Sequence, residues 1–146
     1  MYLKKNCDNE RAFTLLELLV VTIIIGVLVS LVLPRYDIVT ERMRATEGVN
    51  HLIAILGAER RWALDQNPQQ YTATLGNLDF QMPGGWNNFQ APTLFTPALG
   101  SDATLATIQR NVLGGDPFLY TLSITERIGT ISCSGGAAGI CAKLGF

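Results

Sequence analysis

The chain has 146 residues and a net charge of −1, with a hydrophobic share of 48% and a charged share of only 16%. It carries no basic block, which argues against a nucleic-acid partner. A single membrane anchor with a small head accounts for these numbers: about 80 residues remain for the head, whose core is marginal at that size without a disulfide or a packing partner.

The first predicted element is a membrane-spanning helix over residues 13–33, an aliphatic run with few polar interruptions. As a helix it is about 31 Å long, enough to cross a bilayer core. Lys4, Lys5 and Arg11 precede it and predict a cytoplasmic N-terminus with the head outside. A cleaved secretory signal would be shorter and followed by an A-x-A site. An ordinary signal anchor fits the length but does not explain Glu17, a carboxylate at membrane depth that calls for a partner.

The sequence AFTLLELLVVTIIIGVLVSLVLP, residues 12–34, resembles the class III signal of type IV pilins and their pseudopilin relatives. In that family a short charged leader ending in Gly precedes Phe-Thr-Leu-Ile-Glu-Leu and an apolar stretch. The resemblance implies that a prepilin peptidase cuts between Ala12 and Phe13 and methylates the new amine, giving N-methylphenylalanine. Ala12 stands where the family has Gly; its side chain is still small, so we expect processing at a reduced rate.

The resemblance also gives roles to three residues inside the helix. It implies that Glu17 neutralises the N-terminal amine of a neighbouring subunit and so sets the assembly register; the alternative is an acid that reaches the headgroups from the helix start. Gly26 and Pro34 bracket a stretch of weak helix propensity. The family interpretation is a segment that unwinds when the subunit leaves the bilayer, and the alternative is a simple kink.

Residues 34–66 are predicted to continue as an amphipathic helix, which Asn67-Pro68 ends. Seven apolar residues at helical spacing are expected to form the face of this helix that the head covers: Val39, Met43, Val49, Leu52, Ile53, Leu56 and Ala63. Basic and acidic residues alternate between them and predict a solvated, salt-bridged face: Arg42, Arg44, Arg60 and Arg61 with Glu41, Glu47 and Glu59. Gly48 and Gly57 are expected to permit close packing or bending.

The head is predicted to hold an antiparallel sheet that covers the amphipathic helix. The clearest strand is PFLYTLSIT at 117–125, where residues alternate between apolar and polar, and IGTISC at 128–133 returns beside it. Two strands are too few for stability, so residues 71–115 must supply one or two more.

Cys133 and Cys141 flank a short glycine-rich loop, while Cys7 lies on the cytoplasmic side with the leader. Two interpretations of the pair are open, a disulfide and a metal site; the sequence has one histidine, His51, to add to a metal site. A bridge here resembles the disulfide-bounded C-terminal loop of many type IV pilins. In the chain-entropy model it would stabilise the head by roughly 2–3 kcal/mol.

Enzyme chemistry finds no support in the sequence. His51 has no evident nucleophile partner and is expected to be a packing or interface residue. Asp116 in GGDPF is a candidate calcium ligand, but one carboxylate is too few and a turn is the better interpretation. Electron transfer along Phe13, Tyr36 and Trp62 is disfavoured by their wide spacing. We expect no catalytic residues, no metal and no cofactor.

The sequence therefore predicts an α+β, pilin-like chain of four parts. These are a cleaved leader at 1–12, a transmembrane and filament-core helix at 13–33, an amphipathic helix at 34–66 and a β-sheet head at 67–146. The resemblance implies a filament of identical subunits joined through residues 13–64 and built by an inner-membrane platform and ATPase. The precursor would be a single-pass inner-membrane protein and the filament extracellular, or periplasmic for a pseudopilin of a type II secretion system. A membrane-anchored binding module that never polymerises is the alternative outside the filament class.

Overall fold

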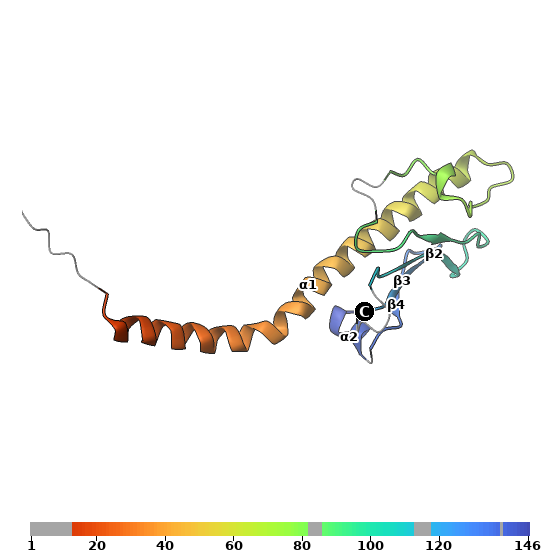
Figure 1. The fold of residues 1–146 in the computed structure, drawn as a ribbon. Coiled ribbons are helices and arrows are strands. Elements are labelled where there is room, and N and C mark those ends of the chain that lie inside the picture. Colours follow the sequence, from red (N-terminus) through yellow and green to blue (C-terminus); the bar gives the residue numbers. More distant parts are fainter. Residues whose placement is uncertain (1–12, 82–85, 113–117, 138) are drawn as a thin grey trace, which may run out of the picture. The chain divides into compact units, whose positions relative to one another are not determined.

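The computed structural model describes residues 13–81, 86–112, 118–137 and 139–146. Predictions that concern Ala12 and Asp116 lie outside these residues. The chain divides into two compact units, Met1–Asp37 and Ile38–Phe146. Helix α1 contributes to both of them (Figure 1).

Helix α1 spans Leu15–Asp65 and has 51 residues, in agreement with the single long helix expected from the sequence. It begins directly after Thr14 and ends just before Asn67-Pro68, where the residue preceding a proline is disfavoured in the helical conformation. Pro34 lies within the span of α1, and the side chains of residues 33–35 are not among those described.

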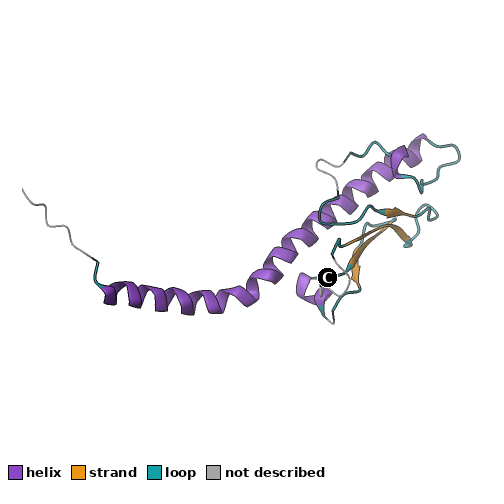
Figure 2. Cartoon of the chain, in the orientation of Figure 1, coloured by secondary structure: helices purple, strands orange, loops and turns teal. Residues whose placement is uncertain are grey.

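A four-stranded antiparallel sheet, in the order β1-β2-β3-β4, forms the other layer of the head. Strands are drawn in orange in Figure 2. Its members are β1 (Thr93–Leu94), β2 (Thr104–Gln109), β3 (Thr121–Thr125) and β4 (Ile131–Ser134). The two short helices are the 3₁₀ helix η1 (Leu75–Asn77) and α2 (Ile140–Leu144). The fold is therefore the α+β arrangement that the sequence predicts, with two strands supplied by the middle of the chain.

Alternation along β3 decides which face of the sheet is apolar. Leu122 and Ile124 are fully buried, while Ser123 between them is half-buried and shares a hydrogen bond with Ser132 of β4. The register pairs Leu122 with Ile108 of β2 on one side. One face of the sheet thus carries the core and the other carries hydroxyls, as expected for an antiparallel sheet with one side in solvent.

The core lies between this apolar face and the C-terminal half of α1 (Figure 1). Leu52 and Ile55 of α1 are fully buried in it. Gly48 faces the sheet, and a Cβ built there would lie 2.6 Å from Phe89 Cζ and 2.9 Å from Leu122 Cδ1. The absence of a side chain at Gly48 therefore allows the helix to approach the sheet, as expected from the sequence.

Three sequence expectations are wrong in detail. The sequence predicts a strand over residues 117–125, but β3 begins only at Thr121. Tyr120 lies outside the strand, although its carbonyl accepts a hydrogen bond from Arg110 N. The assignment of apolar residues to the covered helix face fails for Val39, Met43 and Ile53, which are exposed. The prediction of a solvated charged face is wrong for Glu41 and Glu59, which are buried. Arg110, 69 residues along the chain, donates to Glu41, and Thr72 N, in the loop after the helix, donates to Glu59.

Candidate functional site

The start of α1 is closed by a reciprocal pair of hydrogen bonds between Thr14 and Glu17. Glu17 N donates to Thr14 Oγ1 at 3.2 Å, and Thr14 N donates back to Glu17 Oε2 at 3.3 Å. The Thr14 hydroxyl also lies 3.2 Å from the same carboxylate oxygen. This is a capping box, in which each side chain satisfies a backbone N–H that the helix leaves free. Within one subunit the Glu17 carboxylate is therefore held four residues from Phe13, which is 71% exposed.

The next turns of α1 are apolar on every side. Leu15–Val32 has a mean hydropathy of 2.9, none of it is buried, and its length and composition are sufficient to cross a membrane. The two hydroxyls in this stretch are bonded to the helix itself, Thr22 Oγ1 to Leu19 O at 2.9 Å and Ser30 Oγ to Val27 O at 2.7 Å. These hydroxyls need no partner outside the helix, so the polar side chain of this segment that still calls for one is Glu17, at its N-terminal end.

Further along, α1 has an apolar stripe on the side away from the sheet. Its members are each more than half exposed: Val39, Met43, Ile53 and Leu64. Gly57 lies among them, and a Cβ built there would meet an Arg61 side-chain nitrogen at 3.5 Å, an ordinary van der Waals contact. We call these four residues the outer stripe. A stripe of this kind is suited to packing against another apolar helix.

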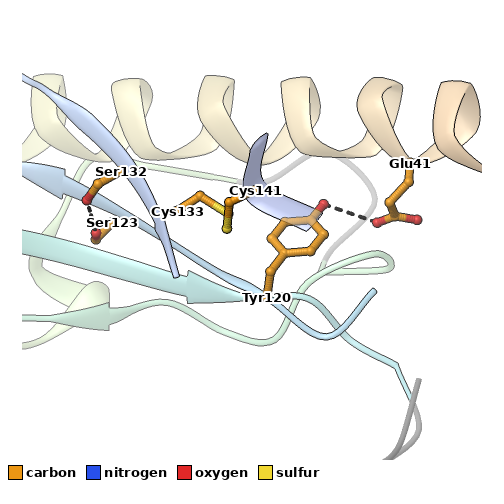
Figure 3. The surroundings of a disulfide bond; sticks show 6 residues. All are labelled: Glu41, Tyr120, Ser123, Ser132, Cys133 and Cys141. Atoms are coloured by element: carbon orange, nitrogen blue, oxygen red, sulfur yellow. Dashed lines mark hydrogen bonds between the residues drawn. A yellow bond between two sulfur atoms is a disulfide. The ribbon is translucent and has the colours of Figure 1, made fainter. Parts of the chain in front are cut away.

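The opposite side of the helix is joined to the sheet by a buried charge network around Glu41. Its Oε1 accepts a hydrogen bond from Tyr120 Oη at 3.1 Å (Figure 3). Oε1 also accepts one from Arg110 Nε at 2.5 Å, and Oε2 accepts one from Arg44 Nη1 at 3.0 Å. Arg110 Nη1 also donates to the Asn88 carbonyl at 2.6 Å. Burial raises the pKa of Glu41, but the bonds from Arg110 and Arg44 outweigh burial and hold it below its usual value. Glu41 is therefore an ionised carboxylate that fixes the helix to the sheet.

Two more buried carboxylates lie near the C-terminal end of α1. Glu59 Oε2 accepts a hydrogen bond from Thr72 N at 3.0 Å, and burial raises its pKa above the usual value. Glu126 Oε1 accepts one from Tyr71 Oη at 2.5 Å, and burial together with this bond raises the pKa of Tyr71 to about 12. Both carboxylates hold the loop that follows α1.

The C-terminus is held by the disulfide between Cys133 of β4 and Cys141 of α2, whose Cα atoms are 5.6 Å apart (Figure 3). It agrees with the disulfide that the resemblance implied. Ile140 of α2 enters the core, and Arg42 Nε of α1 donates to the Lys143 carbonyl at 2.8 Å. The bridge and this bond together keep α2 against the long helix.

His51 takes part in packing, as expected. Its Nε2 is 3.4 Å from Glu47 Oε1, and its ring meets that of Trp86 edge-on at 5.7 Å between centroids. Across the part of the chain that the structure describes, no group of three or more His, Cys, Asp or Glu side chains could hold a metal ion.

Comparison with known proteins identifies the N-terminal segment. A family model described as the prokaryotic N-terminal methylation motif matches residues 7–33. The type II secretion system core protein G of Escherichia coli is 40% identical over 87 residues, which are 60% of this chain and 54% of the relative. The protein of the same name from Klebsiella pneumoniae is 41% identical over 60 residues, 41% of this chain and 43% of the relative.

The methylation motif and the similarity to type II secretion system core protein G support a relationship of this chain to the type IV pilins and pseudopilins. It spans about half the length of the curated relatives it matches. No solved structure matches it significantly. The pilin-like fold is therefore established here from the chain itself, through its long apolar helix and four-stranded sheet.

The structure distributes the predicted site residues over the pilin-like chain in three places. Phe13 and Glu17 lie together at the start of α1, and Gly26 lies within the apolar stretch, where a Cβ would have open space beyond the adjacent residues and the nearby helix backbone. Cys133 and Cys141 are joined at the other end of the chain. The part that Gly26 and Pro34 play as a kink or unwinding segment stays a prediction.

Two functional features were not found from the sequence. The capping box has a local signal, Thr14-x-x-Glu17 at the start of an apolar run, which would have predicted a helix start at Leu15. The Glu41 network has no local signal, since Arg110 is 69 residues away along the chain.

Proposed function

We propose that this chain is the structural subunit of a type IV pilus-like filament. Prepilin peptidase cuts it between Ala12 and Phe13 and methylates Phe13, and the subunits polymerise through residues 13–64. The observation that carries this proposal is the surface of α1, which is predominantly apolar with no buried residue over Leu15–Val32 and carries the outer stripe beyond it. Apolar surface of this extent needs lipid before assembly and other helices afterwards.

Glu17 acts in this proposal as the assembly register. Its carboxylate is held at the helix start by Thr14, so the subunit presents a charge of known position near the free amine of Phe13. In the filament the carboxylate pairs with the amine of a neighbouring subunit. Mutual pairing offsets much of the cost of burying both charges, whereas a shifted register strands each of them.

The partners and location follow from the same proposal. The precursor sits in the inner membrane with its N-terminus in the cytoplasm, where prepilin peptidase processes it. An inner-membrane platform with its ATPase then extracts it into the filament, for adhesion, motility or DNA uptake. The family is structural, and we infer that this chain, too, has no enzymatic role.

A second candidate is a pseudopilin of a type II secretion system, which would build a short periplasmic filament. The names of the Escherichia coli and Klebsiella pneumoniae relatives favour it. The disulfide-bounded C-terminus between Cys133 and Cys141 favours the pilin. The two candidates share processing and helix packing and differ in where the filament is found.

The test is intact mass and N-terminal sequencing of the chain recovered from sheared surface material and from the membrane. A chain in the sheared fraction that begins at Phe13, heavier by one methyl group and lighter by two hydrogens for the bridge, supports the pilin. The same processed chain confined to the cell envelope supports the pseudopilin. An unprocessed chain dispersed in the membrane contradicts both candidates and favours a binding module that does not polymerise.

The matched variants are Glu17→Gln, which removes the charge, and Thr14→Val, which removes the hydroxyl cap. We expect Glu17→Gln to be processed but absent from filaments. Thr14→Val keeps the carboxylate for intersubunit pairing, so we expect its filaments to form. Filaments of normal abundance from Glu17→Gln would refute the register role.

A further inference from the structure

A groove of about 590 Å³ lies where the loop after α1 meets the loop between β1 and β2. Trp62 from the last turns of α1 forms one wall, residues 69–73 and Asn77 form the next, and residues 96–99 form the third. Its volume is within the range of small-molecule sites. The groove lies entirely within the head, and neither the register role of Glu17 nor the outer stripe uses it.

The walls of the groove are neutral. None of its lining residues carries a charge: Trp62, Gln69, Gln70, Tyr71, Thr72, Ala73, Asn77, Thr96, Pro97, Ala98 and Leu99. Charged side chains lie in two adjoining hollows. One holds Asp65 and Arg61, whose guanidinium is paired with Asp79 through two bonds of 2.8 Å. The other holds Arg60, which donates to the carbonyls of Glu126 and Arg127. A charged ligand would find no counter-charge in the groove, so electrostatics favours a neutral one.

The loop that lines the groove is fixed from behind by the two buried carboxylates. Tyr71 donates to Glu126 and Thr72 N donates to Glu59, so neither Tyr71 nor Thr72 is free to turn. The Thr72 hydroxyl in turn accepts a bond from Asn77 Nδ2 at 3.0 Å. The groove is therefore preorganised, which lowers the entropy that a ligand must overcome.

Several polar groups on its walls remain available to a ligand. Among the described residues no hydrogen bond is formed by the Gln69 or Gln70 side-chain amides, by the Thr96 hydroxyl or by the Trp62 indole N–H. Asn77 uses its amide nitrogen and leaves its oxygen free to accept. Donors and acceptors thus line the groove beside a half-buried indole ring and the side chain of Leu99, which is 46% exposed.

We propose that this groove binds a neutral carbohydrate. A pyranose ring has an apolar C–H face that packs on an indole, and an edge of hydroxyls that both donate and accept. Trp62 supplies the apolar wall, and the planar amides of Gln69 and Gln70 supply donors and acceptors for adjacent hydroxyls. An uncharged lining excludes the acidic sugars, which would be desolvated without a partner.

The test is titration of the purified full chain, in a detergent without a sugar headgroup, with maltotriose, cellotriose and chitotriose, and with trigalacturonate as the charged control. Fluorescence is followed in a Trp86→Phe background, which leaves Trp62 as the reporter. We expect a saturable change with at least one neutral trisaccharide and none with trigalacturonate. Replacing Gln69 and Gln70 with Ala should weaken binding by at least about 10-fold, since each lost hydrogen bond accounts for roughly 5-fold.

Gln90→Ala is the matched control, because Gln90 is also exposed but lies outside the groove. Thermal unfolding of each variant verifies that the head is folded. The proposal is overturned if no neutral trisaccharide binds, if the paired Gln variant binds as well as the Gln90 control, or if an uncharged Gly/Ser peptide binds and the saccharides do not. Since the measurement uses unassembled subunits, its failure would leave the filament proposal intact.

Discussion

The sharpest stability test of the head is the replacement of Arg110 with Met. Glu41 is 1% exposed and would lose its strongest partner while keeping Arg44 at 3.0 Å and Tyr120 at 3.1 Å. Breaking a buried pair by removing one member costs about 3–5 kcal/mol, and the two remaining bonds place the loss near the lower limit. At about 4 °C or more per kcal/mol for a head of this size, Tm should fall by roughly 12 °C or more.

The double variant Glu41→Leu/Arg110→Met is the control that separates a stranded charge from lost packing. It removes both charges from the interior, which is often neutral or stabilising relative to the pair. Tyr120 then lacks its acceptor, at a cost of about 1 kcal/mol. We therefore expect the double variant to be more stable than Arg110→Met and at most slightly less stable than the unaltered chain.

The pH dependence gives a second, independent check on Glu41. Because its pKa is lowered in the folded chain, its contribution to stability is present above the unfolded value near 4.5 and is lost as pH falls through the folded pKa. In Arg110→Met, burial acts with less opposition and the carboxyl takes up its proton at higher pH. The Tm difference between the unaltered chain and Arg110→Met should thus shrink as pH falls from 7 toward 4.

The assay is thermal unfolding of the full chain in detergent, followed by the near-ultraviolet circular dichroism of the head's aromatic residues. An unchanged Tm in Arg110→Met would refute the reasoning. So would a double variant as unstable as the single one, since the loss would then come from packing. A Tm difference that widens in acid would show that Glu41 is not the group responsible.

Three further outcomes are expected from the same unfolding measurements. Replacing both Cys133 and Cys141 with Ser should lower the free energy of unfolding by about 2.5 kcal/mol, the value that the chain-entropy model gives for a loop this short. Equal stability with and without the disulfide would contradict this prediction. Gly48→Ala should destabilise the head by about 1–3 kcal/mol, because the new Cβ would lie 2.6 Å from an aromatic carbon. Gly57→Ala should stabilise the helix by roughly 0.5–1 kcal/mol, because its Cβ would make only an ordinary contact, at 3.5 Å, with the Arg61 side chain. The same sign for both would be evidence against the packing argument. Glu59→Gln should raise stability at pH 7, because the raised pKa of Glu59 means that folding favours its neutral form. This gain should disappear in acid, where the native carboxyl takes up its proton. A gain independent of pH would contradict the raised pKa of Glu59.

Local patterns predicted much of this chain because local physics decides those features. The helix that ends before Asn67-Pro68, the alternation of Leu122 and Ile124 on β3 and the pairing of β3 with β4 all follow from residues close in sequence. The start of α1 belongs to the same class, since Thr14 and Glu17 are three residues apart.

The two faces of the second half of α1 were assigned only in part from the sequence: Leu52, Leu56 and Ala63 are buried as predicted, and Val49 packs against the core. Helical spacing places Val39, Met43 and Ile53 on the covered side only if apolar residues always face the core. In the structure, Glu41 occupies the N-terminal end of that side. Arg110, which lies 69 residues further along the chain, pairs with its carboxylate. No local signal announces a partner at that distance, so a buried carboxylate resembles a solvated one.

This inversion bears on function. A monomeric head would be expected to cover its apolar residues and expose its charges, yet α1 buries Glu41 and leaves Met43 72% and Leu64 71% exposed. A buried charge network fixes geometry at little gain in stability, whereas exposed apolar side chains cost solubility unless another surface covers them. The buried Glu41 network and the exposed outer stripe are both explained if the network fixes α1 against the sheet so that the outer stripe faces neighbouring helices. The stripe is then part of the filament interface, and its replacement by polar residues should impair assembly while leaving the head folded.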